Sequence, residues 1–138
     1  MRVTQVAKNL KVTPDTVRFY TRKGYLTPTK DFESGYKNYS DKDIQRLRFI
    51  INARQLGFTV DEIGKIIGEA EKGKSPCPLV RELILDHLNE TEHRFQEMLT
   101  LRKRMKSAIK NWQDKPDKQP TGTMICHLIE NFSQVKKE

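Results

Sequence analysis

The two cysteines of this chain are its most reactive side chains, and they lie far apart in the sequence. Cys77 stands in the segment Ser-Pro-Cys-Pro, and Cys126 stands near the C-terminal end, directly before His127. The first ten residues contain no apolar stretch typical of a secretion signal, so we expect a reducing cytoplasm. Cysteines in that compartment are free thiols or metal ligands more often than disulfide partners. Cys77 and Cys126 are therefore candidate metal ligands or redox-active thiols.

A long helix is predicted between the two cysteines. Pro78 can begin it, and neither Gly nor Pro recurs before about Gln113. Alternating steps of four and three residues along this segment meet mostly apolar side chains, which is the heptad pattern of a coiled coil. At 1.5 Å per residue the helix is a rod of roughly 50 Å, too long to bury this face within its own domain. The predicted dimer interface consists of Ile84, Leu88, Phe95, Met98, Met105, Ile109 and Trp112.

An antiparallel homodimer is the simplest way to bury that apolar face. It places Cys77 of one protomer beside Cys126 of the other, which predicts a composite thiolate site across the dimer interface. Accordingly, residues 72–78 are expected to be a linker, residues 79–113 the dimerisation helix, and residues 114–138 an effector (metal-binding) loop and tail.

The first part of the chain is predicted to hold a helix-turn-helix. Apolar residues from Val3 to Leu10 recur on one helical face. A second helix follows, with Thr13 as N-cap and Pro14 at its first position, and Gly24 is placed to end it. Two short helices joined by a tight turn make this motif.

A small β-hairpin, or wing, and two further helices are expected next. The β-prone runs 25–27 and 36–39 flank turn residues at 32–35. Capping boxes at 40–43 and 59–62 then open helices that end near Gly57 and residue 71. The predicted fold is mainly α: a winged helix-turn-helix DNA-binding domain in residues 1–71, a long antiparallel coiled-coil dimerisation helix and a short C-terminal effector loop.

Charge and composition point to an anionic partner. The 138 residues carry a formal net charge of +8, with 26 Lys and Arg against 18 Asp and Glu. No apolar run approaches the roughly 20 residues that cross a bilayer. The basic residues of the second helix lie within a predicted helix-turn-helix that has helix caps and an adjacent wing. Double-stranded DNA is therefore the expected partner rather than a membrane. No grouping of nucleophile, base and orienting residue occurs, and no glycine-rich phosphate loop, so we expect no enzyme.

Several sequence motifs resemble the MerR family of bacterial transcription regulators. They are Thr13-Pro14-Asp15-Thr16-Val17-Arg18-Phe19-Tyr20, Gly24-Tyr25-Leu26, Ser34-Gly35-Tyr36, Tyr39, Leu47-Arg48-Phe49-Ile50 and Ala53-Arg54-Gln55-Leu56-Gly57-Phe58-Thr59. The resemblance is close over residues 1–71, and the long helix with a short tail follows the family's layout. Phe19 stands where the family usually has Tyr, and Lys37 replaces the usual Arg of the wing. Because lysine offers a point charge where arginine offers a fork of donors, operator preference is expected to differ.

The resemblance implies a mechanism. Members of the family bind, as homodimers, promoters with an overlong spacer between the two polymerase recognition elements. The effector-bound dimer kinks and underwinds that spacer so that RNA polymerase engages both elements, and the regulator becomes an activator. The residues expected at the DNA interface are Thr13, Pro14, Thr16, Arg18, Phe19, Tyr20, Arg22, Lys23, Tyr36, Lys37, Tyr39 and Arg54.

Within the family, the two cysteines resemble those of the metal-responsive branch, of divalent-ion type. Cys77 matches a cysteine just before the dimer helix, and Cys126 matches the last cysteine of the metal loop. The further cysteine of that branch near the end of the dimer helix is absent from residues 112–117. Two thiolates do not complete a tetrahedral site, so His127 with Asp114 or Asp117 would supply the other ligands, a set that suits Zn²⁺ or Cd²⁺.

Two alternatives for the cysteines remain open. Cys77 or Cys126 could be oxidised or alkylated in a thiol-redox or electrophile-responsive regulator with the same DNA-binding half. Unlinked cysteines can also be small apolar residues with no sensing role, which would leave a purely architectural DNA binder. An iron–sulfur sensor is disfavoured, because such clusters usually require four cysteines.

Overall fold

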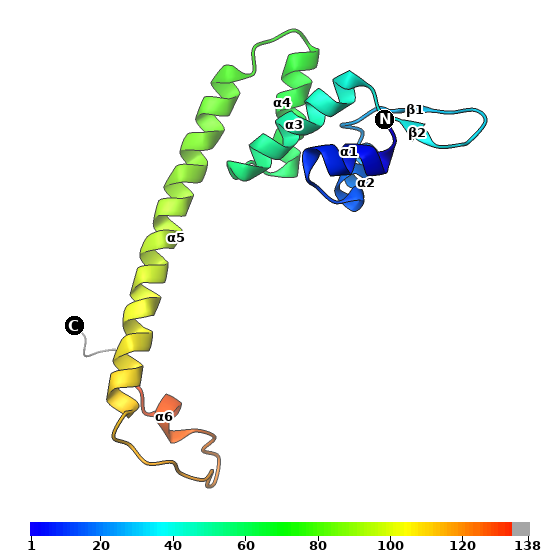
Figure 1. Ribbon diagram of the computed structural model, residues 1–138. Coiled ribbons are helices and arrows are strands. Elements are labelled where there is room, and N and C mark those ends of the chain that lie inside the picture. Colours follow the sequence, from blue (N-terminus) through cyan, green and yellow to red (C-terminus); the bar gives the residue numbers. More distant parts are fainter. Residues whose placement is uncertain (134–138) are drawn as a thin grey trace. The chain divides into compact units, whose positions relative to one another are not determined.

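The structure is a computed structural model and describes residues 1–133. The chain is mainly α-helical, with one small antiparallel hairpin, as predicted from the sequence (Figure 1). It divides into two compact units, the first comprising Met1–Leu88 and the second beginning at Asn89. The elements in chain order are α1 (Val3–Leu10), α2 (Pro14–Arg22), β1 (Thr29–Lys30), β2 (Lys37–Asn38), α3 (Asp41–Gln55), α4 (Val60–Glu71), α5 (Cys77–Trp112) and α6 (His127–Glu130).

The first unit has its own hydrophobic core, to which α1, α2, α3 and α4 all contribute. The first turns of α5 pack against this core through Leu79, Val80, Leu83 and Ile84. Helix α5 therefore begins as part of the first unit. The side chains that are almost completely buried in the core are Val6, Val17, Leu26, Leu47, Ile50 and Ile63.

The predicted helix caps are present. Thr13 Oγ1 accepts the Thr16 backbone N–H at 3.1 Å. The boxes at Ser40 and Thr59 both form, with Asp43 and Glu62 as their acidic partners. These local bonds satisfy backbone donors that a helix leaves open at its start, which is why the helix boundaries follow the sequence signals closely.

The wing differs from its prediction in the first strand. The sequence predicts a strand at 25–27, but the structure pairs Thr29 with Asn38 and Lys30 with Lys37. Leu26 is instead buried in the core, and the Tyr25 hydroxyl donates a hydrogen bond to the Val60 carbonyl oxygen at 2.8 Å. The apolar, β-prone character of this run thus reflects tertiary packing, and the strand begins only after Pro28.

Helix α5 begins at Cys77, two residues before the predicted start of the dimerisation helix, and ends at Trp112. The predicted linker therefore overlaps the first turn of the helix. Pro78 is compatible with that turn, because its missing N–H would have no helical partner there. No helix among the described residues is long and apolar enough to cross a membrane.

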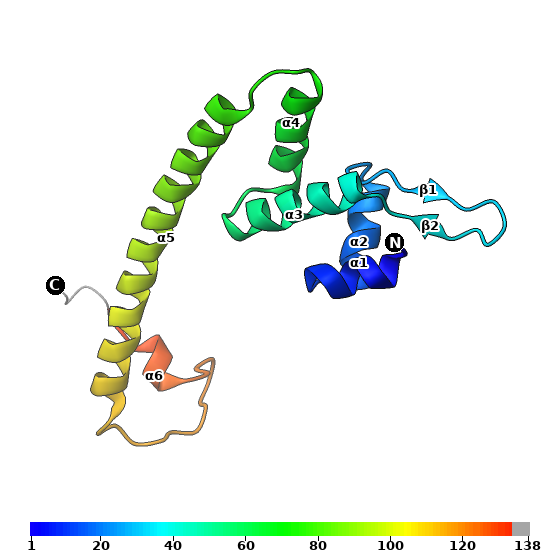
Figure 2. The same cartoon turned by 45° about the horizontal axis from the view of Figure 1, so that its top comes forward.

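The second unit folds its loop back onto the end of α5 (Figure 2). The Trp112 ring meets the Phe132 ring edge-on, with centroids 6.2 Å apart, and Trp112 Nε1 donates a hydrogen bond to the Leu128 carbonyl oxygen at 3.1 Å. The Glu130 carboxylate accepts the backbone N–H groups of Ile125 and Cys126 at 2.8 and 2.6 Å. These contacts give residues 112–132 a defined shape.

Candidate DNA interface and effector region

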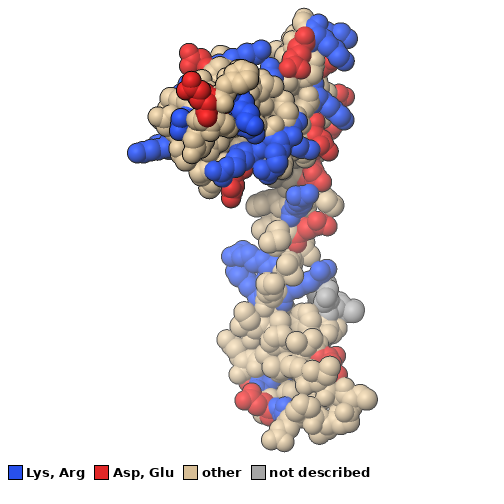
Figure 3. All heavy atoms as spheres, turned by 90° about the vertical axis from the view of Figure 1, so that its right-hand side faces the viewer, with Lys and Arg blue, Asp and Glu red and all other residues tan. Residues whose placement is uncertain are grey.

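Five of the twelve predicted DNA-contacting residues line one depression of the first unit. This hollow of about 700 Å³ lies between the start of α1, the exposed face of α2 and the wing. Figure 3 shows Lys and Arg side chains gathered on the unit that carries the wing. A concave basic surface with a projecting helix and hairpin is suited to double-stranded DNA. The depression is lined by Arg2, Val3, Thr4, Arg18, Arg22, Gly35, Tyr36, Lys37 and Tyr39.

Arg18 is the central cation of α2. Its Nη1 lies 3.0 Å from Asp15 Oδ1, and the two side chains are 51% and 94% exposed. An ion pair this open contributes little to stability. The guanidinium can therefore exchange the Asp15 carboxylate for a phosphate or a base edge at small cost.

Arg2 is a further basic residue of this surface that the sequence reasoning missed. Its guanidinium carbon lies 4.2 Å from the centre of the Tyr36 ring, a cation–π contact that joins the start of α1 to the wing. Arg2 also lines a second hollow beside the hairpin, together with Lys37 and Asn38. The sequence signal that could have indicated Arg2 is its position as a basic residue directly before the first helix.

Tyr20 and Tyr39, both predicted to contact DNA, are buried side chains. They are 6% and 3% exposed. Tyr20 stacks with Tyr25, and the Tyr39 hydroxyl shares a hydrogen bond of 2.7 Å with Thr21 Oγ1. These tyrosines therefore hold α2 against the core and the wing, and Tyr39 also lines the basic depression.

The other predicted interface residues surround the start and the outer face of α2. Thr13 and Thr16 share a hydrogen bond of 2.9 Å at its N-terminus, beside Pro14. Phe19 is 37% exposed, and Lys23 is exposed just after the helix. Backbone N–H groups at a helix start favour a phosphate oxygen, so both ends of α2 can meet the DNA backbone.

Arg54 belongs to a separate hollow from the other basic residues. It lines a depression with Val12, Thr16 and Ile50. Its Nη1 donates a hydrogen bond to the Phe58 carbonyl oxygen at 2.8 Å. The guanidinium is therefore held near Thr16 at the N-terminal end of α2, and within residues 1–133 it makes no ion pair that would compete with a phosphate.

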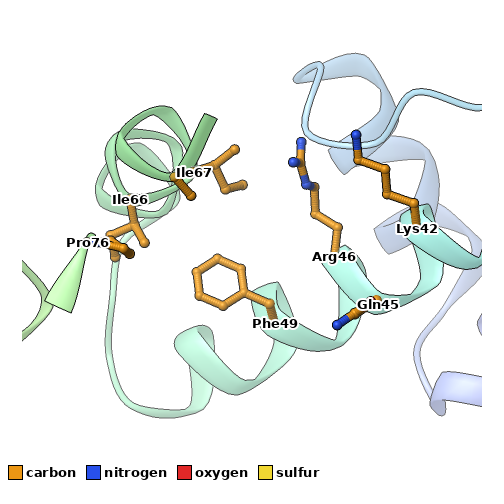
Figure 4. Close-up of a pocket in the computed structure, with 8 residues that line it drawn as sticks. Lys42, Gln45, Arg46, Phe49, Ile66, Ile67 and Pro76 are labelled. Atoms are coloured by element: carbon orange, nitrogen blue, oxygen red, sulfur yellow. The ribbon is translucent and has the colours of Figure 1, made fainter. Parts of the chain in front are cut away.

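An apolar hollow of about 360 Å³ lies on another face of the first unit (Figure 4). Phe49 of α3 faces Ile66 and Ile67 of α4 across it, and Lys42 and Arg46 stand along its α3 edge. Arg46 is paired with Glu71 at 3.1 Å. No sequence expectation concerned this hollow, because it arises from the crossing of α3 and α4.

His87 and Glu62 join α5 to the cap of α4. His87 Nε2 lies 2.7 Å from Glu62 Oε1, and both side chains are 21% exposed. The Thr59 backbone N–H, donating to the carboxylate at 2.9 Å, holds the pKa of Glu62 below its usual value, and His87 adds to this effect. His87 therefore anchors the first turns of α5 to the start of α4.

The two cysteines are free and differ in exposure. Cys77 is exposed at the first position of α5, and Cys126 is partly buried at the N-cap of α6. No side-chain hydrogen bond caps α6 at Cys126, so its sulfur is not committed to the backbone. Each cysteine belongs to a different unit, Cys77 to the first and Cys126 to the second.

His127 is buried, with 7% of its surface exposed. Its Nε2 lies 2.8 Å from the Pro116 carbonyl oxygen, which can only accept. In the neutral ring this fixes the proton on Nε2 and leaves Nδ1 as the basic nitrogen. Metal-binding histidines commonly have their second nitrogen oriented by a carbonyl in this way, although the same bond also ties the loop to itself.

The remaining predicted ligands, Asp114 and Asp117, are exposed in the loop after α5. Within residues 1–133, no three His, Cys, Asp or Glu side chains of a single chain come together as a metal site. The candidate ligands of one chain are thus a thiol on α5 and, in the loop after it, a second thiol and an oriented imidazole.

Comparison with known proteins places the chain in a family. The model of the MerR HTH family regulatory proteins matches residues 1–69, and the model described as MerR, DNA binding, matches residues 44–108. The HTH-type transcriptional regulator ZntR of Escherichia coli strain K12 is 30% identical over 134 residues, covering 96% of this chain and 92% of that protein. The regulator CueR of Escherichia coli O6:H1 is 29% identical over 133 residues, covering 96% and 94%.

A solved structure supports the same fold. The transcription regulator PbrR691 from Ralstonia metallidurans CH34, crystallised in complex with lead(II), superposes with a TM-score of 0.73 at 22% identity. The match covers 96% of this chain and 99% of that one. Two family models that together span residues 1–108 and a relative similar over almost its whole length lead to one conclusion: the chain belongs to the MerR family and is a DNA-binding transcriptional regulator, not an enzyme.

Proposed function

We propose that this regulator binds a promoter spacer as a homodimer and switches transcription by distorting the DNA when a metal ion binds between the protomers. The metal site combines Cys77 of one protomer with Cys126 and His127 of the other. RNA polymerase is the further partner, and it engages the promoter that the regulator has distorted. We propose no membrane partner. The setting is the cytoplasm, where thiols stay reduced.

The basic depression supports the DNA part of this proposal. It unites α1, α2 and the wing around Arg18, Arg22 and Lys37. Arg18 and Arg22 belong to α2 and Lys37 belongs to the wing. Helix α2 packs on the core of the first unit through Val17 and Tyr20, so its part of the surface is formed before DNA arrives. A preformed surface binds DNA without the entropic cost of ordering loops.

The exposed apolar face of α5 supports the homodimer. Leu88, Phe95, Met98, Met105 and Ile109 are each between 53% and 63% exposed in the single chain. A row of large apolar side chains along a helix is typical of a partner interface. The two ends of the predicted seam are already covered in the chain, because Ile84 packs on the first core and Trp112 on Phe132.

The observation that carries the metal proposal is the state of the thiols and of His127. Both cysteines are free, and His127 presents one oriented basic nitrogen directly after Cys126. Sulfur and nitrogen donors of this kind suit Zn²⁺ or Cd²⁺, with Asp114 or Asp117 as candidate oxygen ligands. When bound, the ion would supply a link between protomers that one chain cannot make by itself.

Mixed dimers test the composite site. Cys77→Ser and Cys126→Ser homodimers each lack one ligand at both sites, so both should lose Zn²⁺-dependent transcription from the cognate promoter. A heterodimer of the two variants regains one intact site, and we expect it to recover Zn²⁺ uptake of one ion per dimer by elemental analysis. If both single variants respond to Zn²⁺ and Cd²⁺ like the wild type, the proposed ligands are wrong.

A second candidate function uses the thiols without metal. Cys77 is exposed at the start of a helix, a position accessible to oxidants and electrophiles. In that case reduced protein would take up neither Zn²⁺ nor Cd²⁺, whereas diamide or an aldehyde would change transcription and Cys77→Ser would abolish the response.

A further inference from the structure

The wing is a short hairpin with few bonds of its own to hold its position. Its strands pair Thr29 with Asn38 and Lys30 with Lys37. All four of these residues are exposed, and the hairpin projects from the body of the first unit, helices α1 to α4 (Figure 1). Because a two-stranded hairpin is only marginally stable by itself, contacts with the body must set its position.

The base of the wing is anchored through its backbone. The Thr27 N–H donates to Asp43 Oδ1 at 2.9 Å, and the Tyr39 N–H donates to the Met1 carbonyl oxygen at 2.6 Å. Tyr39 is also buried in the core. These contacts fix where the hairpin leaves and rejoins the body. They lie outside residues 30–37, so the loop end of the hairpin depends on a further attachment.

Arg2, directly before α1, makes a contact with the loop end of the hairpin. Its guanidinium carbon lies 4.2 Å from the centre of the Tyr36 ring. The hydrogen bonds of the loop itself run between its own residues, as from the Glu33 N–H to Asp31 Oδ1. Among the hydrogen bonds, ion pairs and cation–π contacts within residues 1–133, the Arg2–Tyr36 contact alone joins residues 30–37 to the body.

Both partners of this contact are held by their own backbones. Arg2 is the N-cap of α1, where its N–H donates to Gln5 Oε1 at 3.1 Å and its carbonyl oxygen accepts the N–H groups of Gln5 and Val6. The Tyr36 carbonyl oxygen accepts the Asp31 N–H at 2.8 Å within the hairpin loop. The guanidinium and the ring therefore meet from two defined positions, and their contact sets the distance between the start of α1 and the wing.

The same contact lies beside the cations of the basic depression. Arg2, Tyr36 and Lys37 line that depression together with Arg18 of α2, and the same three residues line the hollow of about 410 Å³ beside the hairpin. Tyr36 directly precedes Lys37 in the chain. The contact that holds Tyr36 therefore also limits the movement of Lys37 relative to Arg18.

Asp31 makes Arg2 less suited to bind a phosphate itself. It lines the hollow beside the hairpin together with Arg2. Hydrogen bonds from the Glu33 N–H and the Ser34 side chain, and then the charge of Arg2, hold the pKa of Asp31 below its usual value. An ionised carboxylate near the guanidinium offsets part of its attraction for a phosphate. This favours a role of Arg2 exerted through Tyr36.

We infer that Arg2 is a positioning residue of the DNA surface and holds the wing at a fixed distance from α2 through its cation–π contact with Tyr36. The inference rests on the DNA surface of the proposed function, and the role assigned to Arg2 is exerted on the wing and not on the DNA backbone. With the contact in place, Lys37 and Arg18 are presented to DNA at one spacing. Without it, part of the binding free energy is used to order the wing.

Nuclear magnetic resonance of the full-length protein tests the contact without DNA. Protons of the Arg2 side chain that lie over the Tyr36 ring should be shifted upfield by its ring current. Tyr36→Leu should remove this shift, whereas Tyr36→Phe, which keeps an aromatic ring, should retain it. Arg2 resonances that do not respond to Tyr36→Leu would overturn the inference, whatever the variants do to DNA binding.

A double-mutant cycle on operator affinity tests the role in DNA binding. Arg2→Met and Tyr36→Leu each remove the contact, so each should weaken operator binding by about threefold to fivefold. The double variant should bind no more weakly than the weaker single variant, because the contact can be lost only once. Arg2→Lys and Tyr36→Phe keep the cation and the ring and should bind within about twofold of the wild type. Losses that multiply in the double variant would overturn the inference, because they indicate two independent contacts.

The salt dependence separates positioning from a direct phosphate contact. Loss of a phosphate contact of Arg2 would reduce the slope of log affinity against log salt concentration by about one in Arg2→Met alone. A positioning role predicts the same slope for Arg2→Met and Tyr36→Leu. Lys8→Met is the matched control, because Lys8 is an exposed cation of α1 that lines neither hollow, and its affinity should stay within about twofold of the wild type. A smaller slope confined to Arg2→Met would show that Arg2 binds DNA directly and would contradict the inferred role.

Arg18→Ala distinguishes failure of this inference from failure of the proposed DNA surface. If Arg18→Ala weakens operator binding while Arg2→Met and Tyr36→Leu do not, only the positioning role is wrong. If none of the three variants weakens operator binding, the DNA surface itself is wrong, and the inference fails with it.

Discussion

Glu62 shows how one side chain serves two tasks in this molecule. Its carboxylate completes the capping box of α4 and also contacts His87 at the start of α5. The cap lies within α4, whereas the contact with His87 joins two elements. Its ionisation therefore influences both the start of α4 and the attachment of α5.

The pKa of Glu62 predicts a specific acid sensitivity. The Thr59 N–H bond and then His87 lower this pKa in the folded chain from its ordinary value of 4.5. A depressed carboxylate pKa stabilises the fold at pH values above 4.5 and ceases to do so as pH falls through the lower folded value. Urea unfolding followed by circular dichroism should therefore show a loss of stability below pH 4.5 that is smaller in Glu62→Gln.

Glu69→Gln on the same helix is the control for that experiment. Its carboxylate makes no hydrogen bond or ion pair with another side chain within residues 1–133. The pH profile of this variant should follow the wild type. An identical flattening in both variants would show that the general charge of α4, and not the Glu62 contacts, sets the acid response.

The contribution of Arg18 to operator affinity can be tested by a single substitution. Arg18→Ala removes the central cation of the basic depression while leaving the fold intact, because the side chain is half exposed and its Asp15 partner is solvated. Operator affinity should fall by about tenfold or more, with a shallower salt dependence, in footprinting titrations at several salt concentrations.

Lys65→Ala gives the matched control, because Lys65 is exposed on α4 and lines none of the hollows around α2 and the wing. Its affinity should stay near the wild-type value. Unchanged protection by Arg18→Ala would contradict the placement of α2 against DNA.

The contact between α4 and the segment before the wing depends on the absence of a side chain at Gly64. A Cβ at Gly64 would collide with the Tyr25 ring and its hydroxyl, whereas a Cβ at Gly68 on the same helix would meet nothing within 4 Å. The close approach lets Tyr25 reach the Val60 carbonyl oxygen and stack on Tyr20. Gly64 thus helps to fix the segment that leads from α2 into the wing.

Two glycine substitutions in α4 test the close approach of this helix to Tyr25. Gly64→Ala should lower the free energy of unfolding by about 1–3 kcal/mol, because Tyr25 must leave its place. Gly68→Ala should leave stability unchanged or raise it by up to about 1 kcal/mol, since alanine is the better helix former. Urea denaturation measures both, and equal effects would contradict the proposed collision.

At the scale of the whole molecule, the proposed homodimer links the exposed face of α5 to DNA binding. Phe95 is 57% exposed in the single chain, so Phe95→Asp should leave the fold of the chain intact. It should nevertheless yield a monomer, because burying two carboxylates in the seam is costly. The monomer should lose affinity for a two-half-site operator by about a hundredfold, since linked half-sites bind far more tightly than separate ones.

Size-exclusion chromatography with light scattering, followed by operator titration, checks that outcome. Thr100→Asp places the same charge on the face of α5 opposite the seam and should remain dimeric with unchanged affinity. A dimeric Phe95→Asp variant would show that the seam is not the dimer interface.

Much of the fold was predictable because its signals are local. Caps at Thr13, Ser40 and Thr59 mark where helices begin, and a positive φ of 94° at Gly57 follows the end of α3. The first wing strand was misplaced because Tyr25 and Leu26 have strand-like side chains but pack on distant elements. Arg2 was missed because its role depends on Tyr36, which only folding brings beside it.

By itself, the sequence determined the helices, the basic helix-turn-helix, the family and the apolar seam, since each depends on residues close together in the chain. Only the tertiary structure decided which aromatic residues are core and which are free, as with the buried Tyr20 and Tyr39. It also showed His87 held by Glu62 and His127 oriented by a carbonyl oxygen. Burial and hydrogen-bond partners follow from contacts between distant segments, and local patterns do not contain them.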